Sequence, residues 1–572
     1  MEDTYDVVVV GAGGAGMTAA LAANHRGLST LLIESTEYFG GTTARSGGGV
    51  WIPNNHVLVS AGQRDDAETV RTYLRSIIGG DVDPARIDAF IEHGPASLKF
   101  ITDHSDADFM WVPQYSDYYP EAPGGKVSGR SVEPRPLDGK IIGAELDRLF
   151  PSYTKAPAGL VVTQADFRKI SLGMRTIKGP ITMAKVFVKR LLGLARGRRM
   201  YGMGNAMMIG MRKGLMDADI PVSFSTELTD LVLEDRRVVG VRVTRGGVEQ
   251  VIRARHGVIL GSGGFEKNDE MRQQYQRHPI GIEWSTAAYS NTGGGIRAGI
   301  AAGAEVALMD DAWWGPTIPL PSGPWFCLAE RNLPGSIIVN QAGKRYANEA
   351  SPYVDAVHAM YDGEETTGIA HIPSWMIIDQ RYRNRYLFAG LAPRQPFPGR
   401  WYKHGTIVKG ETLAELAAKI DVPADALDAT VTRFNAMART GQDTDFGRGD
   451  SAYDRYYGDP TVKPNPSLGA IDKAPFYAVL VVPGDLGTKG GIVTDARARA
   501  LRPDGSVIEG LYAAGNASAA VMGHTYAGAG STIGPALTFG YIAAQDIADA
   551  VNAVVEEAPM APSRNHATEE SA

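Results

Sequence analysis

Short apolar runs and a glycine-rich turn alternate at the start of the chain. Residues 5–10 are mostly apolar and β-branched, which predicts a buried strand, and a glycine-rich turn follows at 11–16. Apolar positions with helical spacing run over 17–26, and a second apolar run at 30–33 predicts another strand. A strand, a helix and a strand in this order predict a βαβ unit that opens a parallel sheet.

A similar order of elements returns near the C-terminus. Residues 507–513 predict a strand, 515–518 a turn and 533–551 a helix. We therefore expect the two ends of the chain to share one domain, with other material inserted between them. That material includes a small sheet over 227–251 and a further buried strand at 257–261.

The composition limits the class of function. The 572 residues carry a net charge of −7, with 44% hydrophobic and 21% charged residues, which excludes a disordered chain and argues against nucleic acid as a partner. The single cysteine, Cys327, fits a reducing compartment, and the 11 histidines lack the spacing of a metal site. With no basic leader and no apolar run of about 18 residues, we expect a cytoplasmic protein without a membrane span.

A basic stretch at residues 168–199 departs from this average, because it holds ten cations and no acid. Four of its apolar residues share one face of a predicted helix: Met183, Phe187, Leu191 and Leu194. Two interpretations stay open for this insertion at about 160–205. It is either a solvated basic face or an amphipathic element on anionic lipid headgroups, which would hold the protein peripherally on the inner face of the cell membrane.

Residues 11–16, Gly-Ala-Gly-Gly-Ala-Gly, match the dinucleotide-binding fingerprint. In this pattern Gly11 permits the tight turn, Gly13 lets a pyrophosphate approach the backbone, and Gly16 lets the helix pack closely on the strand. Glu34 follows the second strand and carries a carboxylate where a ribose hydroxyl would bind. The helix N-terminus offers free N–H groups to phosphate.

FAD and NAD share this fingerprint, and two features favour FAD. The glycine-rich stretch 40–49 lets backbone lie along an extended cofactor, and residues 510–516 end a strand in small residues. A helix from Ile533 would point its positive end at the flavin. Since 40–49 holds no histidine or cysteine, we expect FAD to bind non-covalently. The expected cofactor-binding residues are Gly11, Gly13, Gly14, Ala15, Gly16, Glu34, Gly41, Thr42, Thr43, Ser46, Gly47, Gly48, Gly263, Gly515, Asn516 and Ile533.

The predicted fold is therefore α/β. A Rossmann-type FAD-binding domain would comprise residues 1–310 and 484–555, and an inserted α+β catalytic domain would comprise 311–483, where tryptophans and prolines become dense. Residues 556–572 are polar and rich in proline and alanine, which predicts a disordered tail.

Motifs spread over almost the whole chain resemble those of the 3-ketosteroid dehydrogenase flavoproteins, relatives of the fumarate reductase flavoprotein group. They lie at residues 40–53, 116–120, 129–134, 348–353, 483–491, 522–526 and 532–540. Within this family the chain is most similar to the 3-ketosteroid Δ1-dehydrogenases. The resemblance implies a flavin domain in two segments, an inserted catalytic domain and an active site between them.

The resemblance also implies the roles of four residues. Tyr353 matches the tyrosine that abstracts a proton, and Tyr118 matches its supporting tyrosine. Tyr526 matches the tyrosine that hydrogen-bonds the steroid 3-keto oxygen, and Gly530 the glycine whose N–H shares that oxygen. The chain reads Tyr-Ala-Gly-Ala-Gly at 526–530, where the family usually has Tyr-Pro-Gly-Pro-Gly, so we expect a more flexible loop.

These roles fit 1,2-desaturation of a 3-ketosteroid. The ketone acidifies the C2 hydrogen, which Tyr353 would take, while the hydride at C1 would go to flavin N5 and the Tyr526 and Gly530 donors would stabilise the enolate. Because an unperturbed tyrosine has a pKa of about 10, we expect turnover to rise from neutral toward alkaline pH. The electron acceptor would be a quinone or another redox carrier.

Other interpretations stay open. A sibling enzyme could desaturate C4–C5 or prefer 5α-steroids, whereas a fumarate reductase-like enzyme is disfavoured because loop 524–530 has no arginine for a dicarboxylate. His524 could support Tyr526 or simply pack, and Lys489 is expected to position backbone near the flavin. The candidate aromatic residues for a steroid surface are Trp313, Trp314, Trp325 and Phe326.

Overall fold

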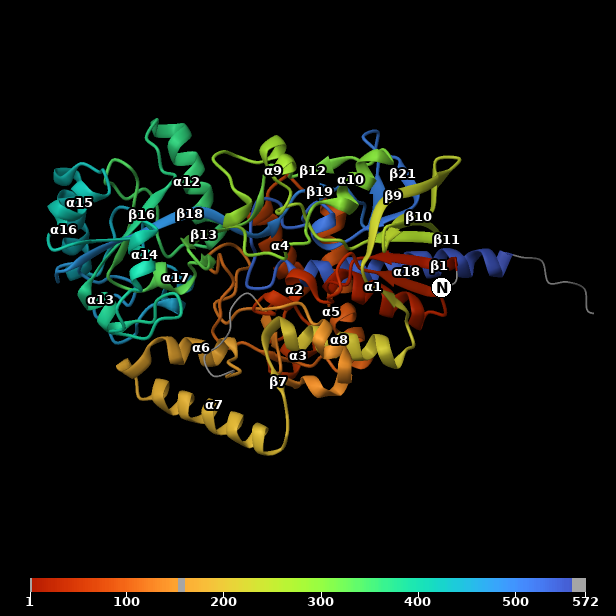
Figure 1. The fold of residues 1–572 in the computed structure, drawn as a ribbon, viewed down its shortest axis with the longest axis horizontal. Helices are drawn as coiled ribbons and strands as arrows, with labels where there is room; N and C mark the ends of the chain where they lie inside the picture. Colours follow the sequence, from red (N-terminus) through yellow and green to blue (C-terminus); the bar gives the residue numbers. More distant parts are fainter. Residues whose placement is uncertain (1–2, 153–159, 558–572) are drawn as a thin grey trace, which may run out of the picture.

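The first sheet gathers strands from both ends of the chain. The structure is a computed structural model, and it describes residues 3–152 and 160–557. The strand order of this sheet is β20 (Arg499–Leu501), β21 (Val507–Ala513), β11 (Val248–Leu260), β1 (Thr4–Val10), β2 (Thr30–Ile33) and β8 (Val222–Ser223). The strands from β21 to β8 run parallel, and β20 is antiparallel to β21. Strands β1 and β21 pair with opposite edges of β11, so both ends of the chain contribute strands to this one sheet (Figure 1).

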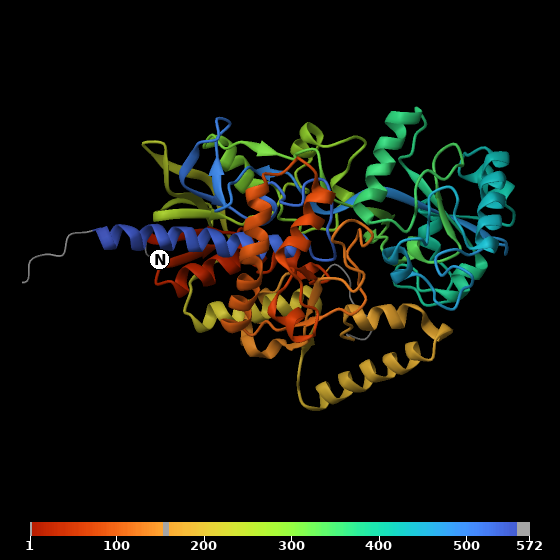
Figure 2. The same cartoon turned by 180° about the vertical axis from the view of Figure 1, so that it is seen from behind.

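Two helices from opposite ends of the chain pack on each other beside this sheet. Helix α1 (Gly14–His25) follows β1, and it lies against α18 (Ile533–Glu557) in the main hydrophobic core. Figure 2 shows α18 as the long C-terminal helix, whose far end projects from the molecule. The helix continues two residues into the segment 556–572, which was predicted to be disordered, and residues 558–572 lie outside the described part.

The turn between β1 and α1 requires its glycines. Gly11 has a φ of +100°, and a Cβ there would lie 2.5 Å from the carbonyl oxygen of Gly261 on the neighbouring strand connection. A Cβ on Gly16 would lie 1.8 Å from the Gly11 carbonyl oxygen, so the helix can approach the strand only without a side chain. At Gly13 a Cβ would meet nothing within 4 Å, because this residue faces open space.

The second sheet is antiparallel and belongs to the inserted part. Its strands are β14 (Gly323–Phe326), β13 (Ala312–Leu320), β18 (Phe476–Thr488), β16 (Ser374–Asp379) and β15 (Ser336–Val339), with β17 (Ile407–Gly410) also on β18. Helices α12 (Tyr353–Thr367), α15 (Leu413–Lys419) and α16 (Ala424–Thr440) surround it at the opposite end of the molecule (Figure 1). Strand β18 continues past residue 483, where the inserted domain was expected to end.

The chain passes between the two sheets along a pair of neighbouring segments. Strand β12 (Val306–Ala307) pairs with β19 (Gly491–Ile492), and β13 pairs with the end of β18 at Ala312 and Thr488. Backbone hydrogen bonds hold the two segments together between these pairings, including one from the Lys489 N–H to the Asp311 carbonyl oxygen (3.1 Å).

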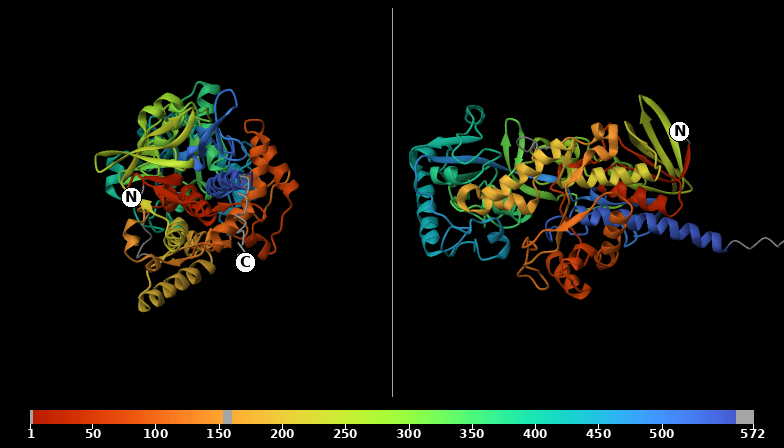
Figure 3. Two further views of the ribbon diagram at one scale, coloured as in Figure 1. Left: turned by 90° about the vertical axis from the view of Figure 1, so that its right-hand side faces the viewer. Right: turned by 90° about the horizontal axis from the view of Figure 1, so that it is seen from below.

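The basic insertion forms a helical hairpin on the outside of the molecule. It consists of α6 (Gln164–Ser171) and α7 (Lys178–Ala195), and α7 lies along the lower edge in Figure 1 and in the left view of Figure 3. The face of α7 toward α6 is narrow, with Val186 buried, whereas the predicted apolar residues are about half exposed, as in Phe187 (50%) and Leu194 (53%). Among the described residues, no helix has the length and apolar character to span a bilayer.

The other elements complete the described chain. They are α2 (Gly41–Arg45), β3 (Val50–Trp51), α3 (His56–Ser60), α4 (Ala67–Ile78), α5 (Pro84–Asp103), β4 (Phe109–Trp111), β5 (Ser131–Pro134), β6 (Leu137–Asp138), β7 (Met200–Tyr201), α8 (Met203–Asp217), β9 (Thr226–Glu234), β10 (Arg237–Arg245), α9 (Asp269–Tyr275), α10 (Gly294–Ala301), α11 (Ala329–Asn332), α13 (Gln380–Arg385), α14 (Gly399–Lys403), α17 (Ala452–Tyr457) and the 3₁₀ helices η1 (Gly139–Arg148), η3 (Gly173–Arg175), η4 (Ile282–Trp284) and η5 (Gly515–Ala517).

Candidate active site

A cavity of about 610 Å³ is lined by residues from both sheets and their connections. Every residue predicted to bind cofactor or act in catalysis lines it, with the exception of Gly16, which is buried under the β1–α1 turn. The lining therefore brings together residues predicted from motifs more than 500 positions apart, such as Gly13 and Tyr526.

One end of the cavity fits an extended dinucleotide. Gly13 faces open space there, and the N-terminus of α18 begins at Ile533 in the lining. The Glu34 carboxylate is fixed at the end of β2, because it accepts hydrogen bonds from the N–H groups of Ala12 and Thr36, both at 2.9 Å. A helix N-terminus, a fixed carboxylate and an uncovered glycine are the features that pyrophosphate and ribose need.

A series of hydrogen bonds supports Thr42 in the cavity lining, and the sequence did not predict it. The Thr42 hydroxyl accepts hydrogen bonds from the Ala288 N–H and the Asn291 side-chain amide, both at 3.0 Å. The same amide group donates to the fully buried Glu266 at 2.6 Å, and burial raises the pKa of Glu266 to about 7. These contacts fix Thr42 in the lining through residues with no motif of their own.

Three tyrosines meet at the other end of the cavity. Tyr118, Tyr353 and Tyr526 are 3–4% exposed, and their ring centroids are 5.1–5.4 Å apart. Tyr118 follows β4 in an irregular segment, Tyr353 is the first residue of α12, and Tyr526 lies in the loop before α18. Residues from three separate chain segments thus form one aromatic cluster.

Burial governs the ionisation of this cluster. It raises the pKa of Tyr353 well above its usual range, and the neighbouring Tyr526 hydroxyl adds to the rise, while a hydrogen bond with Tyr118 opposes it. Burial likewise raises the pKa of Tyr118 and Tyr526. At neutral pH all three side chains are therefore phenols, which can donate hydrogen bonds without carrying charge.

The loop that carries Tyr526 has restraints in place of the two missing prolines. The Ala527 carbonyl oxygen accepts hydrogen bonds from the Tyr73 hydroxyl (2.6 Å) and from the Tyr118 N–H (3.0 Å). The Thr532 hydroxyl donates to the Tyr526 hydroxyl oxygen at 3.1 Å. These contacts tie the loop to the segment of Tyr118, whereas the sequence predicted a more flexible loop.

Gly530 lies where a side chain has no room. Its φ is +103°, and a Cβ there would lie 2.4 Å from the backbone of Gly49. Its carbonyl oxygen accepts hydrogen bonds from the N–H groups of Trp51 (3.2 Å) and Gly534 (2.8 Å). The backbone at Gly530 is therefore fixed between the glycine-rich stretch and the start of α18.

Two carboxylates connect the tyrosine-bearing segments, the half-buried Asp355 and the buried Asp311. The Tyr119 hydroxyl, next to Tyr118, donates to Asp355 in the first turn of α12 at 2.8 Å. Asp311 accepts from His524 at 3.0 Å and pairs with Lys489 at 3.1 Å. The Lys489 side chain is thus a fully buried ion-pair partner, while its backbone belongs to the segment between the sheets.

The candidate aromatic residues divide into two groups. Trp325 and Phe326 line the cavity, and Phe326 packs edge-on against Tyr353 at 5.2 Å. Trp313 and Trp314 are buried core residues outside the lining, although Trp313 packs on Tyr526 at 5.2 Å. The cavity therefore has the apolar, aromatic wall that a flat apolar substrate requires.

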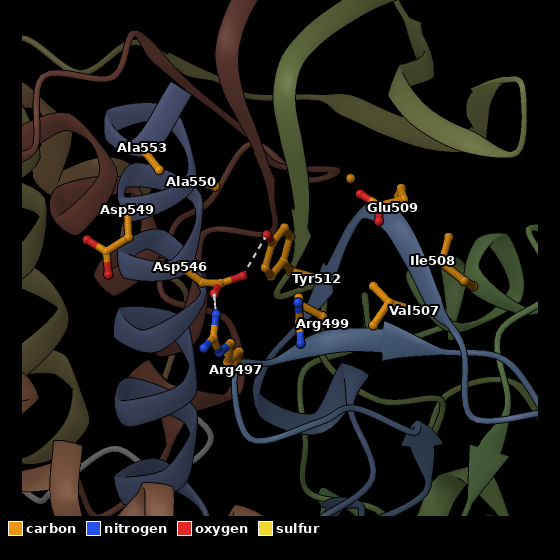
Figure 4. A pocket seen from close by; sticks show the side chains of 11 residues that line it. Arg497, Arg499, Val507, Ile508, Glu509, Tyr512, Asp546, Asp549, Ala550 and Ala553 are labelled. Atoms are coloured by element: carbon orange, nitrogen blue, oxygen red, sulfur yellow. Dashed lines mark hydrogen bonds and ion pairs between the residues drawn. The ribbon is translucent and has the colours of Figure 1, made fainter. Parts of the chain in front are cut away.

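A second hollow of about 330 Å³ lies beside α18 (Figure 4). In its lining Asp546 pairs with Arg497 at 3.2 Å and accepts a hydrogen bond from the Tyr512 hydroxyl at 3.0 Å. None of the predicted site residues lines it. Across residues 3–152 and 160–557, no group of three or more metal-binding side chains was found.

Comparison with known proteins agrees with this geometry. The sequence profile of the family described as "FAD binding domain" matches residues 6–533. The 3-oxosteroid 1-dehydrogenase of Mycolicibacterium smegmatis is 56% identical over 552 residues, which cover 95% of this chain and 97% of the relative. The chain belongs to the FAD-dependent 3-oxosteroid 1-dehydrogenase family. The resemblance seen in the motifs is therefore confirmed, and FAD is the cofactor.

Two further relatives are similar to this chain over almost its whole length. The solved 3-ketosteroid Δ1-dehydrogenase of Sterolibacterium denitrificans, in complex with 1,4-androstadiene-3,17-dione, superposes with a TM-score of 0.91 at 39% identity, covering 96% of this chain and all of that one. The 4-oxocyclohex-2-ene-1-carboxylate 5-dehydrogenase of Sinomonas cyclohexanicum is 35% identical over 561 residues, covering 95% of this chain and 93% of the relative. The superposition confirms the predicted α/β flavoprotein fold.

The buried Glu133 on β5 lines the cavity and leads to a prediction about pH. It accepts a hydrogen bond from the N–H of Gln164, the first residue of α6, at 2.6 Å, and burial raises its pKa from 4.5 to about 7. Its contribution to stability is therefore full below pH 4.5 and is lost as pH rises through about 7.

We expect the free energy of unfolding of the native protein, relative to Glu133→Gln, to fall by about 1–3 kcal/mol between pH 5 and pH 8. Urea unfolding at both pH values measures this difference. Glu121→Gln is the matched control, because the exposed Glu121 also accepts a backbone hydrogen bond (from Ala452, 2.8 Å) and should show little change. An equal difference at both pH values for Glu133→Gln would contradict the assignment.

Proposed function

We propose that this chain catalyses the 1,2-desaturation of 3-ketosteroids. The observation that carries the proposal is the meeting of three buried tyrosines and the Gly530 backbone at one end of the cavity, next to an aromatic wall. The named activities of the relatives support the same reaction. A steroid has few polar atoms, so a single carbonyl-binding site at the end of an apolar cavity is enough to orient it.

In the proposed reaction the steroid 3-keto oxygen accepts hydrogen bonds from the Tyr526 hydroxyl and the Gly530 N–H. These donors stabilise the charge that develops on that oxygen as the C2–H bond breaks, and Tyr353 takes the C2 proton onto its hydroxyl oxygen. The Tyr118 hydroxyl stabilises the phenolate form of Tyr353. FAD supplies the acceptor for the hydride that leaves C1, which leaves a C1=C2 double bond.

The proposal rests on a division of the chain into a flavin domain of residues 1–310 and 484–555 and a catalytic domain of residues 311–483. The two sheets and the paired segments between them support this division. With this division, the expected cofactor-binding residues and the expected catalytic residues lie where the two domains meet. A substrate there can contact both domains.

Anaerobic mixing with three ketones tests the substrate class. We expect androst-4-ene-3,17-dione to bleach the flavin band and to yield the product with a 1,2-double bond. Bleaching by 5α-androstane-3,17-dione alone would favour the sibling specificity for 5α-saturated steroids. Bleaching by 4-oxocyclohexanecarboxylate alone would instead favour a monocyclic acid substrate and contradict the proposal.

Single hydroxyl deletions test the roles of the tyrosines. We expect Tyr526→Phe to lower the rate constant of flavin reduction by about 100–1000-fold, since one oxyanion donor is lost. Tyr353→Phe should lower it by about 100–10,000-fold, since the base is lost. Tyr453→Phe is the control, because this ring packs on Tyr118 at 4.6 Å and its buried hydroxyl has no hydrogen-bond partner among the described residues.

The same series tests the pH dependence. Because the pKa of Tyr353 is raised, the ionised fraction of this residue grows throughout the range from pH 7 to pH 10, and the rate constant of flavin reduction should rise with it. A flat profile in folded enzyme, or native rates in Tyr353→Phe, would contradict a tyrosine base.

We further propose that the hairpin of α6 and α7 binds an anionic membrane surface. The support is the combination of ten cations without an acid in residues 168–199 and the half-exposed apolar residues of α7. Gln164 and Phe167 of α6 line the cavity, so a steroid or a quinone dissolved in the bilayer would lie close to its entrance. On this basis the electron acceptor is proposed to be a quinone.

Vesicle binding tests the membrane proposal. We expect cosedimentation with vesicles that contain phosphatidylglycerol at low salt, and its loss when Lys189, Arg190, Arg196 and Arg198 are all changed to Glu. Vesicles of phosphatidylcholine alone serve as the neutral control. An unchanged sedimenting fraction in the charge-reversed variant, or none for the native protein at low salt, would contradict the proposal.

A further inference from the structure

The carboxylate of Asp311 contacts three side chains at the point where the chain passes between the two sheets. Asp311 immediately precedes β13 and is 2% exposed. Its Oδ1 atom lies 2.9 Å from Nε2 of His358, and its Oδ2 atom lies 3.0 Å from Nδ1 of His524 and 3.1 Å from Nζ of Lys489. An ionised carboxylate only accepts hydrogen bonds, so both histidines donate to it.

The two histidines belong to the elements that carry two of the active-site tyrosines. His358 lies in α12, which begins at Tyr353, and His524 lies two residues before Tyr526. One carboxylate therefore connects the element of the proposed base with the loop of the proposed carbonyl ligand. These elements come from segments more than 160 positions apart, so their separation depends on such tertiary contacts.

Lys489 keeps this carboxylate ionised and in place. Its side chain is fully buried, and the charge of Lys489 together with the two histidine hydrogen bonds holds the pKa of Asp311 well below its usual range against the effect of burial. Lys489 also lies 5.1 Å from the ring centroid of Trp313, which packs edge-on against Tyr526 at 5.2 Å. The ion pair thus contacts the Tyr526 loop by a second route.

We propose that Asp311 is a positioning residue, which acts through His524 and His358 to set the separation of the Tyr526 and Tyr353 hydroxyl groups. The inference rests on the proposed function, because it gives those two hydroxyls different tasks on one substrate. A displacement of about 1 Å in a reacting group costs about 100-fold in rate, so a contact that fixes the loop affects turnover without touching substrate.

The test substitutes His524, whose side chain is 42% exposed, and leaves Asp311 unchanged. Removal of Asp311 would leave Lys489 buried without its partner, and such a variant risks unfolding. His524→Leu removes the donor, whereas His524→Asn keeps an N–H group near the position of Nδ1. His404→Leu is the matched control, because this exposed histidine contacts Thr406 (2.8 Å) and lies on another element.

We expect His524→Leu to lower the rate constant of flavin reduction by about 10–100-fold. The Kd of androsta-1,4-diene-3,17-dione, measured by fluorescence, should change by less than about threefold, because the lost restraint matters most in the transition state. His524→Asn should recover most of the rate. The FAD content and Tm of each variant establish that it is folded. Native rates in His524→Leu, or no recovery in His524→Asn, would overturn the proposal.

A double-mutant cycle separates this inference from the proposed function. If His524 acts through the Tyr526 hydroxyl, His524→Leu should add less than about threefold to the loss caused by Tyr526→Phe. Additive losses would overturn the positioning role and leave the role of Tyr526 intact. A native rate in Tyr526→Phe would contradict the proposed function itself, and the positioning role with it.

Discussion

The desolvation of three tyrosine hydroxyl groups is the constraint on which the site depends. Tyr118, Tyr353 and Tyr526 lose almost all contact with water, and burial raises the pKa of each. In such surroundings a hydroxyl is an effective neutral donor, whereas a phenolate is costly unless neighbouring donors stabilise it. One hydroxyl can therefore hold a carbonyl oxygen, while another becomes a base only with the help of a third.

The rest of the fold can be understood as the means of bringing these hydroxyls together. The first sheet and α18 fix the glycine-rich backbone that we propose as the binding surface for FAD, and the second sheet places α12 and Tyr353 at the same cavity. A polar contact joins the two parts where the Tyr119 hydroxyl donates to Asp355, and a buried one, from the Tyr73 hydroxyl to the Ala527 carbonyl oxygen, fixes the Tyr526 loop. Buried polar contacts of this kind define one geometry, because each donor has a single partner to satisfy.

Local features of the site could be predicted from the sequence. The fingerprint glycines, the strands at both chain ends and the helix from Ile533 follow from residue spacing, and the structure has them where the pattern predicts. The three tyrosines were found from their motifs, and the structure brings them to one cavity. Their catalytic roles stay a prediction.

Other features depend on contacts between distant segments, which no local pattern contains. Asp311 lies outside the motifs, and the motifs that contain Glu133 and Thr532 do not show which residues they contact; only the folded chain gives the three their partners. Composition could not separate Trp325, in the cavity wall, from Trp314, in the core. The alanines at 527 and 529 predicted a flexible loop. In the structure the Ala527 carbonyl oxygen accepts hydrogen bonds from residues 73 and 118, which are too distant in the chain for the loop sequence to indicate them.

The central claim is that the substrate carbonyl oxygen lies between the Tyr526 hydroxyl and the Gly530 N–H, with C2 next to Tyr353. A crystal structure of the FAD-loaded enzyme with androsta-1,4-diene-3,17-dione tests this most directly. We expect the steroid 3-keto oxygen to lie about 2.7–3.1 Å from both the Tyr526 Oη atom and the Gly530 N atom. A steroid bound with that oxygen toward Trp325, or with C2 out of reach of Tyr353, would contradict it.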